Sequence, residues 1–106
     1  MSKQFNPFQQ TAWFHDAGHE WLGCPRDLLR QHNLEDKISG YSYQTNHPDG
    51  TQVVFLEGDC DASLLIETIG SELYDRAYQA GLISDYDHGM QSSIRDYQHY
   101  QPHSNF

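Results

Sequence analysis

TQVVFLEGDCDASLLIETIGSELYDRAYQAG, residues 51–81, predicts a buried strand followed by an amphipathic helix. Both faces of the TQVVFLE run are apolar, which is typical of a central strand that is covered on both sides. The alternating positions are Val53 and Phe55 on one face and Val54 and Leu56 on the other. In the following segment, apolar residues recur every three or four positions up to Ala80, and Gly81 is expected to end the helix. This core-facing stripe consists of Ala62, Leu65, Ile66, Ile69, Leu73 and Ala77.

The start of this helix is acidic. We expect Asp59 or Asp61 to cap it, because carboxylates at a helix N-terminus accept hydrogen bonds from free backbone N–H groups. Gly70 lies inside the predicted helix, where glycine costs up to about 1 kcal/mol relative to alanine. We therefore expect Gly70 to mark a close approach of the helix to the sheet.

Upstream, the segments TAWFH and HEWLGC flank the turn sequence DAG and predict a β-hairpin. A three-residue turn would give Gly18 a positive φ and place His15 opposite His19, with Trp13 opposite Trp21. A helix is the alternative, since it would also bring His15 and His19 together at positions i and i+4. The internal glycine and the aromatic flanks favour the hairpin.

The remaining segments complete an α+β fold. A short helix is expected from Arg26 to about His32, a half-buried strand along residues 41–45, and a short strand and turn after Gly81. The predicted fold is a small antiparallel sheet of two hairpins, with one short and one longer helix packed on one face. Residues 11–90 would form the single domain. Residues 1–10 would be an arm that packs through Phe5 and Phe8, and residues 91–106 would be an ordered extension or a loose end.

The composition limits the class of protein. The chain has 106 residues and a formal net charge of −9, and it lacks both a membrane-length apolar run and a secretion-signal layout. We therefore expect a soluble protein of the cytoplasm. The acidity argues against direct binding to a nucleic-acid backbone. Two cysteines, Cys24 and Cys60, do not suggest a disulfide framework, and we expect both to be thiols.

Most of the negative charge lies between Ile38 and Ile94, where Arg76 is the only basic residue. Such a region is expected either to be a solvated surface or to meet a basic host protein, whose complementary potential would speed association. The candidate partner-facing residues are Asp59, Asp61, Glu72, Asp75, Asp85, Tyr86 and Asp87.

His15, Asp16 and His19 are the alternative candidate site. Two imidazoles and a carboxylate could hold zinc or another divalent metal if they converged, with a further ligand from residues 59–61. Otherwise Asp16 would shape the turn, and the histidines would pack beside the tryptophans. No catalytic residue is predicted, because a Walker-type lysine, a paired Cys-x-x-Cys and a nucleophile elbow are all absent from the sequence. Outside the metal alternative, no cofactor is expected.

Four stretches of the sequence together resemble a family of small uncharacterised proteins carried by phages, plasmids and other mobile elements. They are HDAGHEWLGCPRDLL, KISGYSYQ, VVFLEGDCDASLLIE and the later SIRDYQHY. The resemblance covers roughly residues 12–100. It departs from the family pattern at Glu20, where glycine is frequent, and at Gly58, where an acid is frequent. The resemblance implies no known activity. It does imply a mobile-element context, and therefore the cytoplasm of a bacterial host.

The sequence thus predicts a non-enzymatic acidic binding protein that inhibits or modulates a host protein. A nucleic-acid-processing defence complex, as in anti-CRISPR or anti-restriction proteins, is the expected class of target. A metal-binding protein or metalloenzyme that uses His15 and His19 is one alternative. A self-associating structural or plasmid-maintenance component is another.

Overall fold

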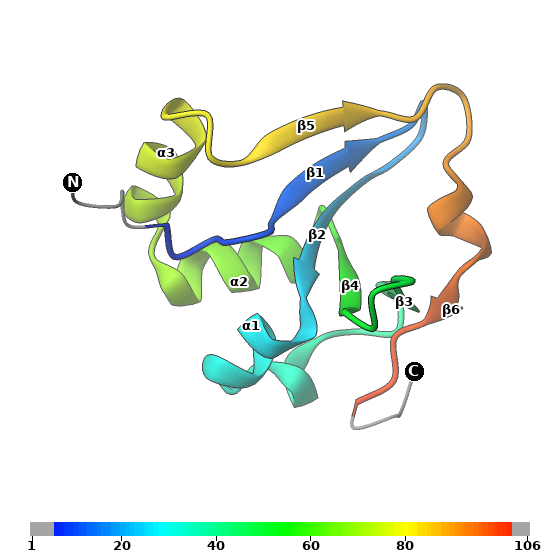
Figure 1. Cartoon of the computed structure of the whole chain (residues 1–106), viewed down its shortest axis with the longest axis horizontal. Coiled ribbons are helices and arrows are strands. Elements are labelled where there is room, and N and C mark those ends of the chain that lie inside the picture. The colour runs from blue at the N-terminus through cyan, green and yellow to red at the C-terminus, as the bar shows by residue number, and fades with distance from the viewer. Residues whose placement is uncertain (1–5, 103–106) are drawn as a thin grey trace.

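In the computed structural model, which describes residues 6–102, a six-stranded sheet forms the centre of the protein, and helices pack on one of its faces (Figure 1). The strands follow the order β5-β1-β2-β4-β3-β6 across the sheet. They are β1 (Ala12–His15), β2 (Glu20–Pro25), β3 (Tyr43–Asn46), β4 (Gln52–Glu57), β5 (Ser84–Asp87) and β6 (Gln98–His99). The helices are α1 (Arg26–Gln31), α2 (Asp61–Ile69) and α3 (Ser71–Gln79), with the short 3₁₀ turns η1 (Glu35–Lys37) and η2 (Ser93–Asp96).

The α+β class is confirmed, but the expected purely antiparallel sheet of two hairpins is wrong. β5 pairs with β1 in parallel, while the other neighbouring strands run antiparallel. The parallel pairing arises because the chain crosses the sheet through α2 and α3 after β4 and returns beside β1. The β4 strand is central, as its apolar faces predict, and lies between β2 and β3.

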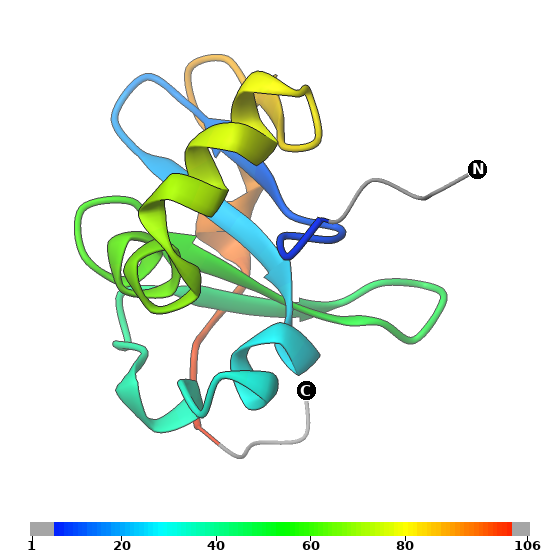
Figure 2. The same cartoon turned by 90° about the vertical axis from the view of Figure 1, so that its left-hand side faces the viewer.

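The main core lies between the sheet and the helices, as Figure 2 shows with α2 and α3 in front of the strands. The sheet contributes Trp13, Leu22, Cys24, Val54 and Leu56, and the helices contribute Leu28, Leu29, Ala62, Leu65 and Ala77. Phe8, from the predicted N-terminal arm, is fully buried in this core, and Phe5 lies outside the described residues. No helix of residues 6–102 is both long and apolar enough to cross a membrane.

The register of the first hairpin differs by one residue from the prediction. Trp13 pairs with Leu22, and His15 pairs with Glu20. The turn is shorter than expected because Asp16 and His19 still pair across it, through a 2.9 Å hydrogen bond from Asp16 N–H to the His19 carbonyl oxygen. The Asp16 carboxylate also accepts the N–H groups of Gly18 and His19, and the φ of Gly18 is not positive. A one-residue shift places Trp13 and Trp21 on opposite faces of the sheet.

The expected single long helix is divided at Gly70. This residue has a φ of 132°, a value that other residues rarely adopt, so the helix stops at Ile69 and restarts at Ser71. Neither predicted cap forms: α2 begins after Cys60 without a side-chain cap, and Asp61 is buried within its first turn.

The C-terminal segment is part of the sheet and not a loose end, as far as residue 102. Its last strand, β6, pairs with β3. Tyr100 is buried, and its hydroxyl donates to the carbonyl oxygen of Glu35 at 2.7 Å. Before β6, η2 crosses the sheet face that carries no helix and buries Ile94 there with Trp21 and Phe55. This second apolar face carries the candidate functional site.

Candidate functional site

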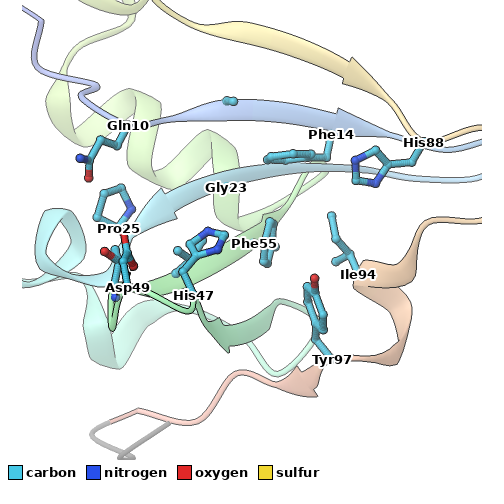
Figure 3. A pocket seen from close by; sticks show the side chains of 13 residues that line it. Gln10, Phe14, Gly23, Pro25, His47, Asp49, Phe55, His88, Ile94 and Tyr97 are labelled. Carbon is cyan, nitrogen blue, oxygen red and sulfur yellow. Dashed lines mark hydrogen bonds between the residues drawn. The ribbon is translucent and has the colours of Figure 1, made fainter.

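An open cavity of about 320 Å³ lies on the helix-free face of the sheet, between the strands and η2. Figure 3 shows Phe14, Phe55, Ile94 and Tyr97 around this hollow, which we call the aromatic groove. Its ends are polar, with His88 at one end and Gln10, His47 and Asp49 toward the other. An apolar hollow of this size with a few polar groups at its margin is the usual form of a binding site.

Gly23 makes the floor of the aromatic groove. A Cβ at this position would lie 2.8 Å from Cε2 of Phe14 and 3.2 Å from Cδ1 of Phe55. These two rings meet edge to face above it, with centroids 5.5 Å apart and planes at 76°. The glycine therefore allows two aromatic side chains to lie against the strands and leave space above them.

The wall formed by η2 is held in place by an ion pair to the first hairpin. Arg95 donates from Nε to Oδ2 of Asp16 at 2.7 Å and from Nη2 to Oδ1 at 2.9 Å. The Ser92 N–H donates to the same carboxylate at 2.9 Å. The Arg95 guanidinium holds the pKa of Asp16 well below its usual range, and the backbone donors add to this effect. Asp16 and Arg95 thus fasten η2 over the sheet and fix the shape of the groove.

The aromatic surface continues from the groove to the outer strand β5. Tyr86 stacks on Phe14 with ring centroids 5.3 Å apart, and the ring of His88 lies 5.2 Å from Phe14. Tyr86 is 50% exposed. It is therefore already positioned by one ring contact and still offers half of its surface to another molecule, which is typical of an interface anchor.

Asp85 and Asp87 lie on either side of Tyr86 along β5 and project to the helix side of the sheet, where they pair in register with Trp13 and His15. We call these two residues the acidic edge. Asp85 accepts a hydrogen bond from the Tyr78 hydroxyl and lies 3.1 Å from Nε2 of His15. The Tyr78 hydrogen bond and the nearby imidazole keep the pKa of Asp85 below its usual value, so this carboxylate remains charged at neutral pH.

The other predicted partner-facing residues do not join this edge. Asp59 is exposed in the turn after β4. Glu72 and Asp75 are exposed on α3, where Glu72 pairs with Arg76 at 2.9 Å, and Figure 1 shows α3 near the start of β5. Asp61 is only 2% exposed, so it cannot serve as a partner-facing charge. Its Oδ2 accepts from the hydroxyls of Ser39 and Ser42, both at 2.6 Å, and from the Ser39 N–H at 3.0 Å.

The three candidate metal ligands line one open pocket at the first turn, but their side chains face different partners. His15 lies on the helix side, between Glu20 at 3.3 Å and Asp85 at 3.1 Å. His19 lies on the groove side, stacked on Trp21. Asp16 is bound to Arg95. Within residues 6–102, no group of three His, Cys, Asp or Glu side chains converges as metal ligands would. The one-residue register shift places His15 opposite Glu20 instead of His19.

The groove, Gly23 and Arg95 were not predicted from the sequence. The sequence does contain one signal for the groove. Val53 and Phe55 require cover on the face opposite Val54 and Leu56, whereas the predicted fold places both helices on one face. No comparable signal identifies Arg95, since its partner Asp16 lies far from it in the sequence.

No family model matches the chain, and comparisons with curated proteins and with solved structures gave no significant match. The function therefore has to be inferred from the aromatic groove and the acidic edge.

Proposed function

We propose that this is a non-enzymatic binding protein that holds a basic partner protein by the aromatic groove and the adjoining acidic edge. The observation that carries the proposal is the continuity of an open aromatic hollow with a strand that exposes Asp85, Tyr86 and Asp87. An apolar side chain of the partner would enter the groove, and basic side chains beside it would meet the two carboxylates.

Hydrophobic burial would supply most of the affinity. A fully buried side chain of leucine or phenylalanine size gains about 1.5–3 kcal/mol, and aromatic residues dominate the energetically important part of protein interfaces. The groove supports such burial because Phe14, Phe55 and Tyr97 line a hollow that the described residues, 6–102, leave open. Little rearrangement would be needed, since the Asp16–Arg95 ion pair already holds the wall.

The acidic edge would supply orientation and speed of association. Each of the four arginines in residues 6–102 pairs with a carboxylate other than Asp85 or Asp87. No arginine in this part of the chain therefore neutralises these two exposed aspartates. The Asp87 carboxylate accepts the Gly89 N–H, and Asp85 contacts His15 and Tyr78. Charge complementarity of this kind mainly raises the association rate and weakens with salt.

The resemblance to mobile-element proteins directs the proposal toward a host target. Proteins that process nucleic acids carry basic channels, and an acidic protein that covers such a channel would inhibit them. A CRISPR or restriction complex of the bacterial host is the class of partner that fits this chemistry. We do not extend the proposal to a metal-dependent activity, because His15 contacts Glu20 and Asp85 whereas Asp16 and His19 both contact Arg95.

Affinity capture from bacterial lysate with matched variants tests the proposal. Ala12 lines the groove, so Ala12→Leu would fill it, whereas Ser63→Leu adds the same side chain to the exposed surface of α2. A genuine partner is retained by the original protein and by Ser63→Leu, and is lost with Ala12→Leu. Its retention falls as salt is raised. Equal capture by both variants, or no partner common to the original protein and Ser63→Leu, would contradict the proposal.

A further inference from the structure

We propose that β5 is a docking edge on which the partner protein adds a strand of alternating basic and apolar residues. This inference rests on the proposed function and specifies the form of the partner segment. The acidic edge and the groove margin then act as parts of one strand-recognition surface.

The backbone of β5 is oriented for such an addition. β5 has only β1 as a neighbour, and Figure 1 shows it along the outer border of the described chain. The N–H of His88 donates to the carbonyl oxygen of His15 at 2.7 Å. Bonding groups alternate along a parallel strand, so Tyr86 also turns its backbone toward β1. The N–H and C=O groups of Asp85 and Asp87 consequently face outward, as pairing with a further strand requires.

The side chains of β5 specify the sequence of the added strand. Asp85 and Asp87 lie on the helix side of the sheet, and Tyr86 lies on the groove side against Phe14. A strand beside β5 would place its own side chains alternately on the same two sides. Basic residues would lie beside the aspartates, and an apolar residue between them would lie beside Tyr86 at the margin of the groove. The expected segment therefore alternates basic and apolar residues.

The same charges disfavour a second copy of this chain as the occupant. Pairing two β5 strands would bring aspartates of both copies together, and like charges across a strand pair are destabilising. A basic strand removes this repulsion and replaces it with attraction. The acidic edge thus blocks self-pairing and selects a partner of opposite charge.

The test uses a short synthetic peptide of alternating lysine and valine, with a peptide of the same composition in block order as its control. Two variants separate charge from backbone pairing. Asp87→Asn removes one charge and keeps the outward N–H, whereas Asp87→Pro removes both and leaves the hydrogen bonds to β1 in place. Binding is measured by NMR titration, and amide hydrogen exchange is measured at Asp85 and Asp87. Unchanged exchange at His88 verifies that β5 remains paired with β1.

We expect the alternating peptide to bind the original protein and to slow exchange at both aspartate amides. Asp87→Asn should weaken binding about two- to fivefold, as for an exposed ion pair. Asp87→Pro should weaken it by up to about tenfold more than Asp87→Asn, because it also removes one backbone hydrogen bond. The block-order peptide should bind more weakly than the alternating peptide, because it cannot place basic side chains beside both aspartates and an apolar side chain beside Tyr86.

Three results would overturn the inference: absence of binding, equal binding of the two peptides, or binding without protection of Asp85 and Asp87. Dimerisation through β5 in solution would also overturn it, since a second copy would then occupy the edge. The proposed function is judged separately. A host partner that is lost with Ala12→Leu but retained by Asp87→Pro would leave the groove function standing and would exclude strand addition.

Discussion

Gly23→Ala changes the floor of the aromatic groove by a single methyl group, and its effect can be worked out from the geometry. The new Cβ would lie 2.8 Å from Cε2 of Phe14, whereas carbon atoms normally approach to about 3.5–4.0 Å. The Phe14 ring would therefore have to retreat by about 0.7 Å or more, into the space of the groove. Overpacking of this kind costs about 1–3 kcal/mol. Replacing a strand glycine by alanine itself stabilises the fold by about 0.5–1 kcal/mol, so the expected net loss of stability is about 1 kcal/mol and at most about 2.5 kcal/mol.

Thermal unfolding followed by circular dichroism measures this loss, with Gly40→Ala as the matched control. A Cβ at Gly40 would meet no heavy atom within 4 Å, and its φ is not positive. One kcal/mol corresponds to about 4 °C in a domain of this size, so Gly23→Ala should melt up to about 10 °C lower and Gly40→Ala should be close to the original protein. Adding Phe14→Leu to Gly23→Ala should recover part of the loss by relieving the clash. Equal melting temperatures for the two alanine variants would refute the described packing of the groove floor.

Three further predictions concern the ion pair, the buried aspartate and the thiols. Asp16→Asn should lower the melting temperature at pH 7. Because folding lowers the pKa of Asp16, the difference in melting temperature between the variant and the original protein should shrink as the pH falls below about 4. A difference that does not depend on pH would contradict the ion-pair account. Asp61→Ala should lower the free energy of unfolding in urea by about 3 kcal/mol, because it leaves the hydroxyls of Ser39 and of the buried Ser42 without their acceptor. As a control, Asp59→Ala at an exposed position should change this free energy by less than about 0.5 kcal/mol. Cys60 is exposed and should react with a thiol reagent in the native protein. Cys24 is buried, and desolvation raises its pKa to about 12, so it should react only after unfolding. Rapid labelling of both thiols in the native protein would show that this part of the core is open.

The sequence predicted elements whose signals are local. The apolar run of β4, the helix after Pro25 and the short strand after Gly81 are confirmed at nearly the expected residues. These features depend on periodicity and on residues that start or stop elements, both of which can be read within a few positions.

The features that determine the site depend on single contacts between distant residues. The hairpin register follows from how the Asp16 carboxylate binds the turn, and this register places His15 opposite Glu20 instead of His19. The wall of the groove depends on the bond between Asp16 and Arg95. The helix break at Gly70 depends on a backbone angle that the apolar stripe running through it conceals. Composition and periodicity carry no information about these contacts.

Site-specific photo-crosslinking tests the central claim most directly. A photoreactive phenylalanine analogue replaces Tyr86, beside the groove, or Glu67, which is exposed on α2. In bacterial host lysate, the probe at position 86 should give a discrete adduct with a protein that carries a basic surface, and the adduct should diminish at high salt. The probe at position 67 should give none. An adduct from position 67 with none from position 86 would place the binding surface on the helices and contradict the account.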